Sequence, residues 1–132
     1  MTDESLRAAL RDLARGARGL HKAMLDVETQ YFGAVGGLLE HLQLVTNHPH
    51  FAWLLKLSGL MAELDERLDD AEPFEAAEAA QFRTAFESLL GPRPAIDEEF
   101  RRRYLALLHD APEVAIANGT LRQALGKVPR AE

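Results

Sequence analysis

The sequence predicts an all-α protein resembling a four-helix bundle, with a long N-terminal helix and additional short helices. Three observations support this prediction. Apolar residues recur every three or four positions in each long segment, as they do along one face of a helix. Proline, glycine and capping residues separate these segments. No segment alternates apolar and polar β-branched residues in the way that predicts a strand.

The first helix is expected over residues 3–32. Its apolar residues are spaced alternately four and three positions apart, which keeps one stripe facing a neighbouring helix. The stripe consists of Leu6, Leu10, Leu13, Ala17, Leu20, Met24, Val27 and Tyr31. Thr2 or Asp3 can cap the start. Such a helix is about 45 Å long, so we expect either a bend near Gly16 and Gly19 or one projecting end.

Three further helical segments precede the clearest loop of the chain. A short apolar segment covers residues 38–46. Two longer helices are expected over residues 49–70 and 73–90, and each begins at a proline, which is favoured in a first helical turn. Glycine and two prolines then predict a loop over residues 91–94.

The C-terminal part is expected to form one medium helix and two short ones. Asp97 is a suitable N-cap for the medium helix. Asp110 and Glu113 match a capping box, which predicts the start of a short helix. We expect that helix to end at residues 118–119 (Asn-Gly), and a last turn or two to begin at Thr120.

Composition favours a single cytoplasmic domain over residues 1–132. The chain has no cysteine, which excludes disulfides, cysteine-ligated metals and thiol catalysis and suggests a reducing compartment. The formal net charge of −6 disfavours nucleic acid as a partner. No apolar run approaches the roughly 20 residues of a membrane span, and the acidic start lacks a signal-peptide core. We therefore expect neither a nucleic-acid nor a membrane partner.

The motifs of the common helical-bundle chemistries are missing. Di-iron sites need Glu-x-x-His pairs, but Tyr31 stands three residues beyond Glu28 and Gln43 stands three beyond Glu40. The sequence also has no His-x-x-x-His zinc pair and no glycine-rich phosphate loop. We therefore expect no cofactor, no metal site and no catalytic residue, and we favour a role other than an enzyme.

Three histidines leave a metal-binding alternative open. His41, His48 and His50 lie in one local stretch, and three imidazoles could meet around a transition metal. The simpler interpretation is that His48 and His50 are polar residues at a helix start, because histidines so close in sequence usually point apart.

A polar pocket near the end of the first helix is a second alternative. His21 and Glu28 lie seven residues apart on the same flank of the apolar stripe, so they could share a pocket with Trp53. A flank residue paired with a neighbouring helix, and an aromatic anchor in the core, are the structural alternatives.

Two charged surfaces stand out. A basic stripe steps along the first helix: Arg7, Arg11, Arg15, Arg18 and Lys22. Residues 63–78 hold eight acidic residues against one arginine. Both surfaces could be solvated faces, or they could meet complementary charge on another molecule. Ala9, Gly16 and Ala23, spaced seven apart, would let a second helix approach closely, either from this chain or from another.

Two segments carry a resemblance to a known family. Residues 20–28 read L-H-K-A-M-L-D-V-E, and residues 51–58 contain F-A-W-L followed by L-S. They resemble the segments L-H-K-x-(L/M)-L-D-x-E and F-A-W-L-x-x-L-S of a family of small, uncharacterised bacterial all-helical proteins, over about residues 20–70. The resemblance implies an all-helical fold and no known activity. The positions that match its motif are His21, Lys22, Asp26, Glu28 and Trp53.

Together these patterns predict a helical bundle that acts by binding another protein or itself, as a homodimer, through the basic stripe. The alternative is a small-ligand or metal-binding protein, conceivably an enzyme, that uses His21, Glu28 and Trp53 or the histidines at positions 41, 48 and 50.

Overall fold

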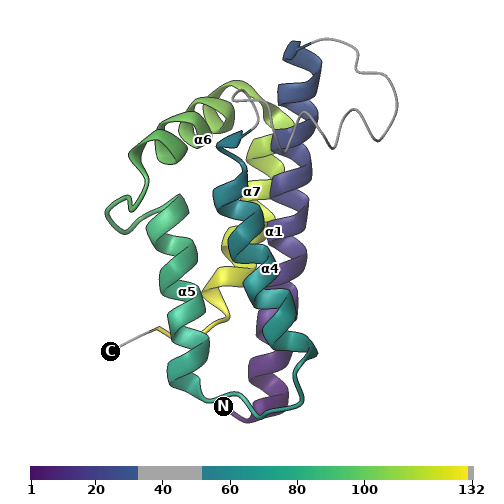
Figure 1. The fold of residues 1–132 in the computed structure, drawn as a ribbon, viewed down its shortest axis with the longest axis vertical. Coiled ribbons are helices and arrows are strands. Elements are labelled where there is room, and N and C mark those ends of the chain that lie inside the picture. Colours follow the sequence, from purple (N-terminus) through teal and green to yellow (C-terminus); the bar gives the residue numbers. More distant parts are fainter. Residues whose placement is uncertain (33–51, 131–132) are drawn as a thin grey trace.

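A computed structural model describes residues 1–32 and 52–130 and confirms the all-α class. These ranges contain no strand and five helices: α1 (Asp3–Phe32), α4 (Leu55–Asp69), α5 (Ala76–Leu90), α6 (Glu98–Asp110) and α7 (Pro112–Gly126). Four of them, α1, α4, α5 and α7, run along the long axis, and α6 lies obliquely near the end where α1 finishes (Figure 1). The four-helix-bundle arrangement stays a prediction, and the short helix expected over residues 38–46 lies outside the described residues.

Helix α1 has the bounds that its apolar stripe predicts. Thr2 caps it, because the Ser5 N–H donates to Thr2 Oγ1 at 3.1 Å. The helix continues through Gly16 and Gly19 without interruption, and its C-terminal end extends past the other described helices (Figure 1). Of the two expected arrangements, the projecting end is therefore the one observed.

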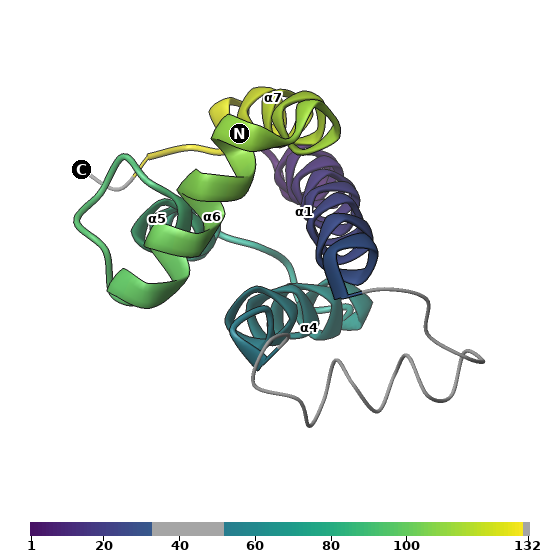
Figure 2. The ribbon, with the colours of Figure 1, turned by 90° about the horizontal axis from the view of Figure 1, so that it is seen from above.

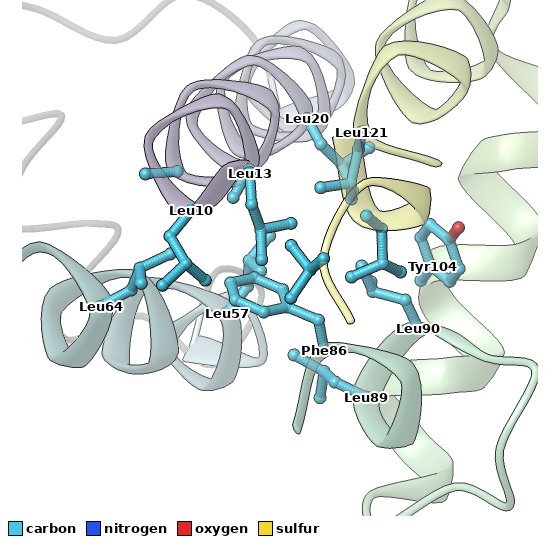
Figure 3. Close-up of a cluster of buried hydrophobic side chains, with 14 of the residues drawn as sticks. Leu10, Leu13, Leu20, Leu57, Leu64, Phe86, Leu89, Leu90, Tyr104 and Leu121 are labelled. Carbon is cyan, nitrogen blue, oxygen red and sulfur yellow. The ribbon is translucent and has the colours of Figure 1, made fainter. Parts of the chain in front are cut away.

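The core lies between α1 and the helices around it. Figure 3 shows leucines of α1 pointing toward side chains from each of the other four helices. The largest fully buried side chains include Leu10, Leu13, Leu20, Leu57, Leu64, Phe86, Phe100 and Tyr104. Burial of one such side chain contributes about 1.5–3 kcal/mol, so this cluster provides the main stabilisation of the fold.

Helix α7 corrects two expectations for the C-terminal part. It runs unbroken past residues 118–119, because its buried face, which includes Val114, Leu121 and Leu125, stays packed on both sides of this pair. The Asn118 side chain accepts a hydrogen bond from the Tyr104 hydroxyl. The predicted end at residues 118–119 and the restart at Thr120 were therefore wrong.

The capping box predicted at Asp110 was also wrong. The N-cap of α7 is Ala111, which offers no side-chain acceptor, and Pro112 fills the first turn. Ala111 also ends α6 through its N–H to the Leu107 carbonyl at 2.8 Å, so one residue joins the two helices. The cap predicted at Asp97 is confirmed, since its Oδ1 accepts from the Phe100 N–H at 2.9 Å.

Helix α5 begins at Ala76, later than the start predicted at Pro73. Helix α4 begins at Leu55, after a turn at residues 53–54, and the helix start predicted at Pro49 lies outside the described residues. Residues 73–75 stay outside the helix because Phe74 is buried and its N–H donates to Asp3 Oδ1 at 2.6 Å. Among the described helices, none has both the length and the apolar character needed to cross a membrane.

Candidate functional site

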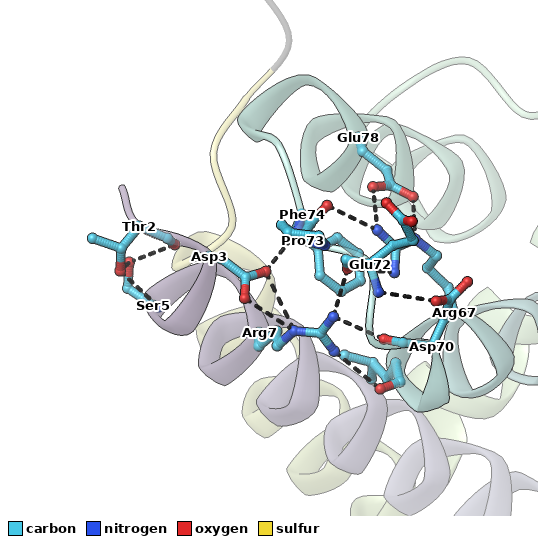
Figure 4. A network of polar contacts seen from close by, with 11 residues as sticks. Thr2, Asp3, Ser5, Arg7, Arg67, Asp70, Glu72, Pro73, Phe74 and Glu78 are labelled. Carbon is cyan, nitrogen blue, oxygen red and sulfur yellow. Dashed lines mark hydrogen bonds and ion pairs between the residues drawn. The ribbon is translucent and has the colours of Figure 1, made fainter.

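The basic stripe of α1 divides into a structural part and an exposed part. Arg7 belongs to the structural part: its guanidinium donates to the carbonyls of Leu68, Asp70 and Glu72 at 3.1, 2.8 and 2.6 Å (Figure 4). It also lies 5.0 Å from the centre of the Phe74 ring. Arg7 therefore fastens the α4–α5 connection to α1 and is not free to bind a partner.

Part of the acidic segment is structural as well. Arg67 lies 4.0 Å from the Phe74 ring and pairs with Glu78 at 2.5 Å, and this hydrogen bond raises the pKa of Arg67. On the side of α1, the hydrogen bond from the Phe74 N–H lowers the pKa of Asp3, and the charge of Arg7 adds to that effect. The aromatic ring is thus held between two guanidinium groups.

A polar hollow lies between α1 and α4. Its volume is about 430 Å³. Helix α1 contributes Arg11, Arg15 and Arg18, and helix α4 contributes Asp65 and Asp69. The structure therefore brings the basic stripe and the acidic segment together within one chain, with cations along one wall and carboxylates along the other.

The arginines of this hollow differ in their partners. Arg18 pairs with Asp65 across the hollow at 3.3 Å, and Arg15 pairs with Asp12 on its own helix at 3.4 Å. Arg11 has neither an ion pair nor a hydrogen bond from its side chain to any part of the chain that the structure describes. Arg11 has no ion pair to break, and the exposed pair of Arg15 contributes little to stability. Both side chains can therefore turn toward a partner at a small cost in free energy.

Lys22 ends the stripe and does not line the hollow. Its ammonium group pairs with Asp26 one turn further along α1 at 2.7 Å. Both side chains are exposed, so this pair is worth a few tenths of a kcal/mol.

The second candidate group is only partly assembled. Trp53 Nε1 donates to Glu28 Oε2 at 3.4 Å, and both residues are buried. The Trp53 ring packs 5.1 Å from the Phe100 ring, so Trp53 is a core anchor that joins the end of α1 to the start of α4. His21 makes no hydrogen bond to either residue within the described ranges.

His21 is nevertheless unusual. It is half-buried on α1, and its Nε2 atom is buried without a hydrogen-bond partner among the described residues. Burial disfavours the charged imidazolium and lowers the pKa of His21. A buried polar atom without a partner is rare enough to require an explanation.

The structure does not describe the three histidines of the metal-binding alternative. His41, His48 and His50 lie outside the described residues. Within residues 1–32 and 52–130, no three histidine or carboxylate side chains gather as metal ligands.

Sequence interpretation missed the arginines that hold the helix connections. Besides Arg67, these are Arg101 of α6 and Arg122 of α7, which bind the C-terminal end of α5. Arg101 donates to the Leu89 carbonyl at 3.0 Å, and Arg122 donates to the Leu90 carbonyl at 2.9 Å. A single arginine within the acidic segment is a visible signal for Arg67, but its partners are set by the tertiary fold.

Comparison of the chain with protein-family models, curated proteins and solved structures gave no match. The resemblance of residues 20–28 and 51–58 to a bacterial family stays a prediction. Function is therefore inferred from the geometry of this chain.

Proposed function

We propose that this protein is a cytoplasmic protein-interaction module that associates with a second copy of itself through the hollow between α1 and α4. The observation that carries the proposal is the arrangement of charge there. Arg11, Arg15 and Arg18 form one wall, and Asp65 and Asp69 form the other. The lack of cysteine fits a reducing compartment.

Two parallel walls of opposite charge make a self-complementary surface. In a dimer whose two-fold axis runs along the hollow, the arginine wall of each copy lies opposite the carboxylate wall of the other. The same patch then serves both copies, as a two-fold interface requires. Charges arranged in this way fix the orientation of the partner and speed its association more than they add affinity.

The ion pairs within one chain indicate which residues would form the most favourable new contacts in a dimer. Arg11 has no partner within the described part of its own chain, and Asp69 is exposed without an ion pair there. A contact between Arg11 of one copy and Asp69 of the other breaks no existing pair. Arg18 already holds Asp65, so its contribution to association is smaller.

Charge reversal followed by mixing tests this proposal. One variant, Arg11→Glu/Arg15→Glu, makes both walls of its hollow mainly acidic. The other variant, Asp69→Arg, makes both walls of its hollow mainly basic. Each variant alone should sediment as a 14.7 kDa monomer. An equimolar mixture should form a heterodimer of twice that mass, because each altered wall then faces its opposite.

A matched control separates this effect from a change in net charge. The variant Arg102→Glu/Arg130→Glu reverses two exposed arginines away from the hollow, and it should associate as the unmodified chain does. Unchanged self-association of Arg11→Glu/Arg15→Glu, or a mixture that stays monomeric, would contradict the proposal.

A second candidate function is supported by His21. Its Nε2 atom, which is buried and has no hydrogen-bond partner among the described residues, would be satisfied by a small polar ligand or a metal ion. Native mass spectrometry and elemental analysis of the purified chain test this alternative. A stoichiometric metal or organic mass that His21→Phe removes supports it, whereas a bare chain mass contradicts it.

A further inference from the structure

A single residue joins α6 to α7. Ala111 is both the C-cap of α6 and the N-cap of α7. Its backbone is extended (φ −118°, ψ 112°), so α7 turns back from α6 and lies beside α1, away from α4 (Figure 2). Because each residue contributes only two freely rotating backbone angles, two angles at Ala111 set the direction of the whole helix α7.

Helix α6 comes close to continuing through this joint. The Ala111 N–H donates to the Leu107 carbonyl at 2.8 Å, which is the usual hydrogen bond of an α-helix. The next bond in the series would join residue 112 to the Leu108 carbonyl, but Pro112 has no N–H to donate. Its ring also disfavours the helical conformation at Ala111. Pro112 is therefore the local feature that separates the two helices.

The contacts of α7 are mainly with distant parts of the sequence. Its most extensive contact is with α1. On another side, Arg122 donates to the Leu90 carbonyl of α5 at 2.9 Å and to the Tyr104 hydroxyl of α6 at 3.0 Å. None of these contacts involves the joint itself. A second copy of the chain has its own α1, α5 and α6, so it offers α7 the same partners.

We propose that the joint at Ala111 and Pro112 is a conformational device that determines which α1 helix receives α7. When the joint is bent, α7 packs on α1 of its own chain. When Ala111 is helical, α6 and α7 form one continuous helix, and α7 packs on α1 of a second copy. Two chains that exchange α7 recover its contacts from each other, which makes exchange a low-cost route to a dimer. Pro112 favours the bent form.

This exchange is independent of self-association through the charged hollow. It uses the face of α1 that α7 covers, whereas the hollow lies between α1 and α4. The two dimers also differ in their response to salt. The fully buried Val114 and Leu121 hold α7 in the exchanged dimer, so this dimer should persist at about 0.5 M salt, where ion pairs in the hollow are screened.

Substitution of Pro112 tests the device. After refolding from urea, which lets exchange reach equilibrium, Pro112→Ala should dimerise at about 0.5 M salt with a Kd of about 10 μM or less. The unmodified chain should have a Kd above about 1 mM there, at least about a hundredfold higher, because its continuous helix would contain a proline. Pro94→Ala is the matched control, since it removes another exposed proline that lies outside the helices, and it should behave as the unmodified chain does. Sedimentation measures all three.

Cross-linking shows which chain supplies α7. Asp12 of α1 and Lys127 at the end of α7 form an ion pair at 3.5 Å, and both side chains are exposed. The chain has no cysteine of its own, so Asp12→Cys in one chain and Lys127→Cys in another give each chain a single thiol. When both chains also carry Pro112→Ala and are refolded together, a short bis-maleimide should join them. With Pro112 retained, the two chains should stay unlinked at about 0.5 M salt.

Pro112→Gly separates a continuous helix from a joint that is only looser. Glycine also lacks the ring, but it is unfavourable inside a helix, so this variant should dimerise at least about fivefold more weakly than Pro112→Ala. Equal dimerisation of the two variants would contradict a continuous helix.

Three further results would overturn the proposal. The first is a loss of helical content in Pro112→Ala by circular dichroism, because a continuous helix keeps at least the original content. The second is a Pro112→Ala chain that stays monomeric, and the third is a dimer without the cross-link between positions 12 and 127. Adding Arg11→Glu/Arg15→Glu to Pro112→Ala should leave the exchanged dimer intact, so failure of the charged hollow and failure of exchange are distinguishable.

Discussion

Gly16 of α1 lies directly against the backbone of Leu121 in α7. A Cβ built on Gly16 would come within 3.0 Å of the Leu121 Cα atom. The α1–α7 contact is the most extensive one between the described helices. The small residue at position 16 therefore allows the close approach of α7 from the same chain. The charged side of α1 is the surface that stays available to a partner.

Gly16→Ala should destabilise the fold by about 1–3 kcal/mol, because the added methyl group forces α1 and α7 apart. Gly19→Ala is the matched change, since a Cβ there meets nothing within 4 Å, and it should stabilise α1 by up to about 1 kcal/mol. Urea unfolding of both variants measures the difference. If Gly16→Ala stabilised the fold as Gly19→Ala is expected to do, α1 and α7 would not be in close contact at Gly16.

Leu20→Ala should lower the free energy of unfolding by about 2–5 kcal/mol, because Leu20 is fully buried in the cluster around α1. Chemical denaturation with circular dichroism detection provides the measurement. A loss well below 1 kcal/mol would mean that this side chain is not packed in the core.

Arg7→Met should cost about 1–3 kcal/mol, because three backbone carbonyls of the α4–α5 connection lose their donor. Arg7→Lys should recover little, since an ammonium group cannot reproduce the planar set of donors. Arg102→Met, at an exposed position, should stay within about 0.5 kcal/mol of the unmodified chain. A similar loss in both methionine variants would remove the special role of Arg7.

The half-buried His21 should make the stability of the fold sensitive to acid. Burial lowers its pKa in the folded chain, so as the pH falls through about 6.5 the unfolded chain takes up a proton before the folded chain does. This contribution to stability is therefore present above about pH 6.5 and is lost progressively below it.

The pH dependence is tested by the free energy of unfolding at about pH 7.5 and 5.5. His21→Gln should lose less stability between these values than the unmodified chain does. His109→Gln, at an exposed position, should retain the full loss. An unchanged pH dependence in His21→Gln would show that His21 is not the responsible group.

The sequence predicted those parts of the fold that depend on local periodicity. The apolar stripe predicted the extent of α1, and its Leu13 and Leu20 are fully buried as expected. The continuity of α7 could not be predicted, because the turn signal at residues 118–119 is overridden by burial of Val114 and Leu121 on either side. Local propensity contributes about 1 kcal/mol at such a site, less than the packing that opposes it.

The candidate site was predicted only in part. Arg7 and Arg11 have the same place in the helical pattern, yet Arg7 holds the α4–α5 connection and Arg11 faces the hollow. That difference depends on where α4 ends in space, which helical periodicity does not contain.

The molecular mass of the unmodified chain at tens of micromolar, measured by sedimentation at low and high salt, tests self-association most directly. The charged hollow predicts a dimer of twice 14.7 kDa at low salt. It should dissociate at about 0.5 M salt, where the Debye length falls to a few ångströms. A 14.7 kDa monomer under both conditions would contradict self-association through α1 and α4.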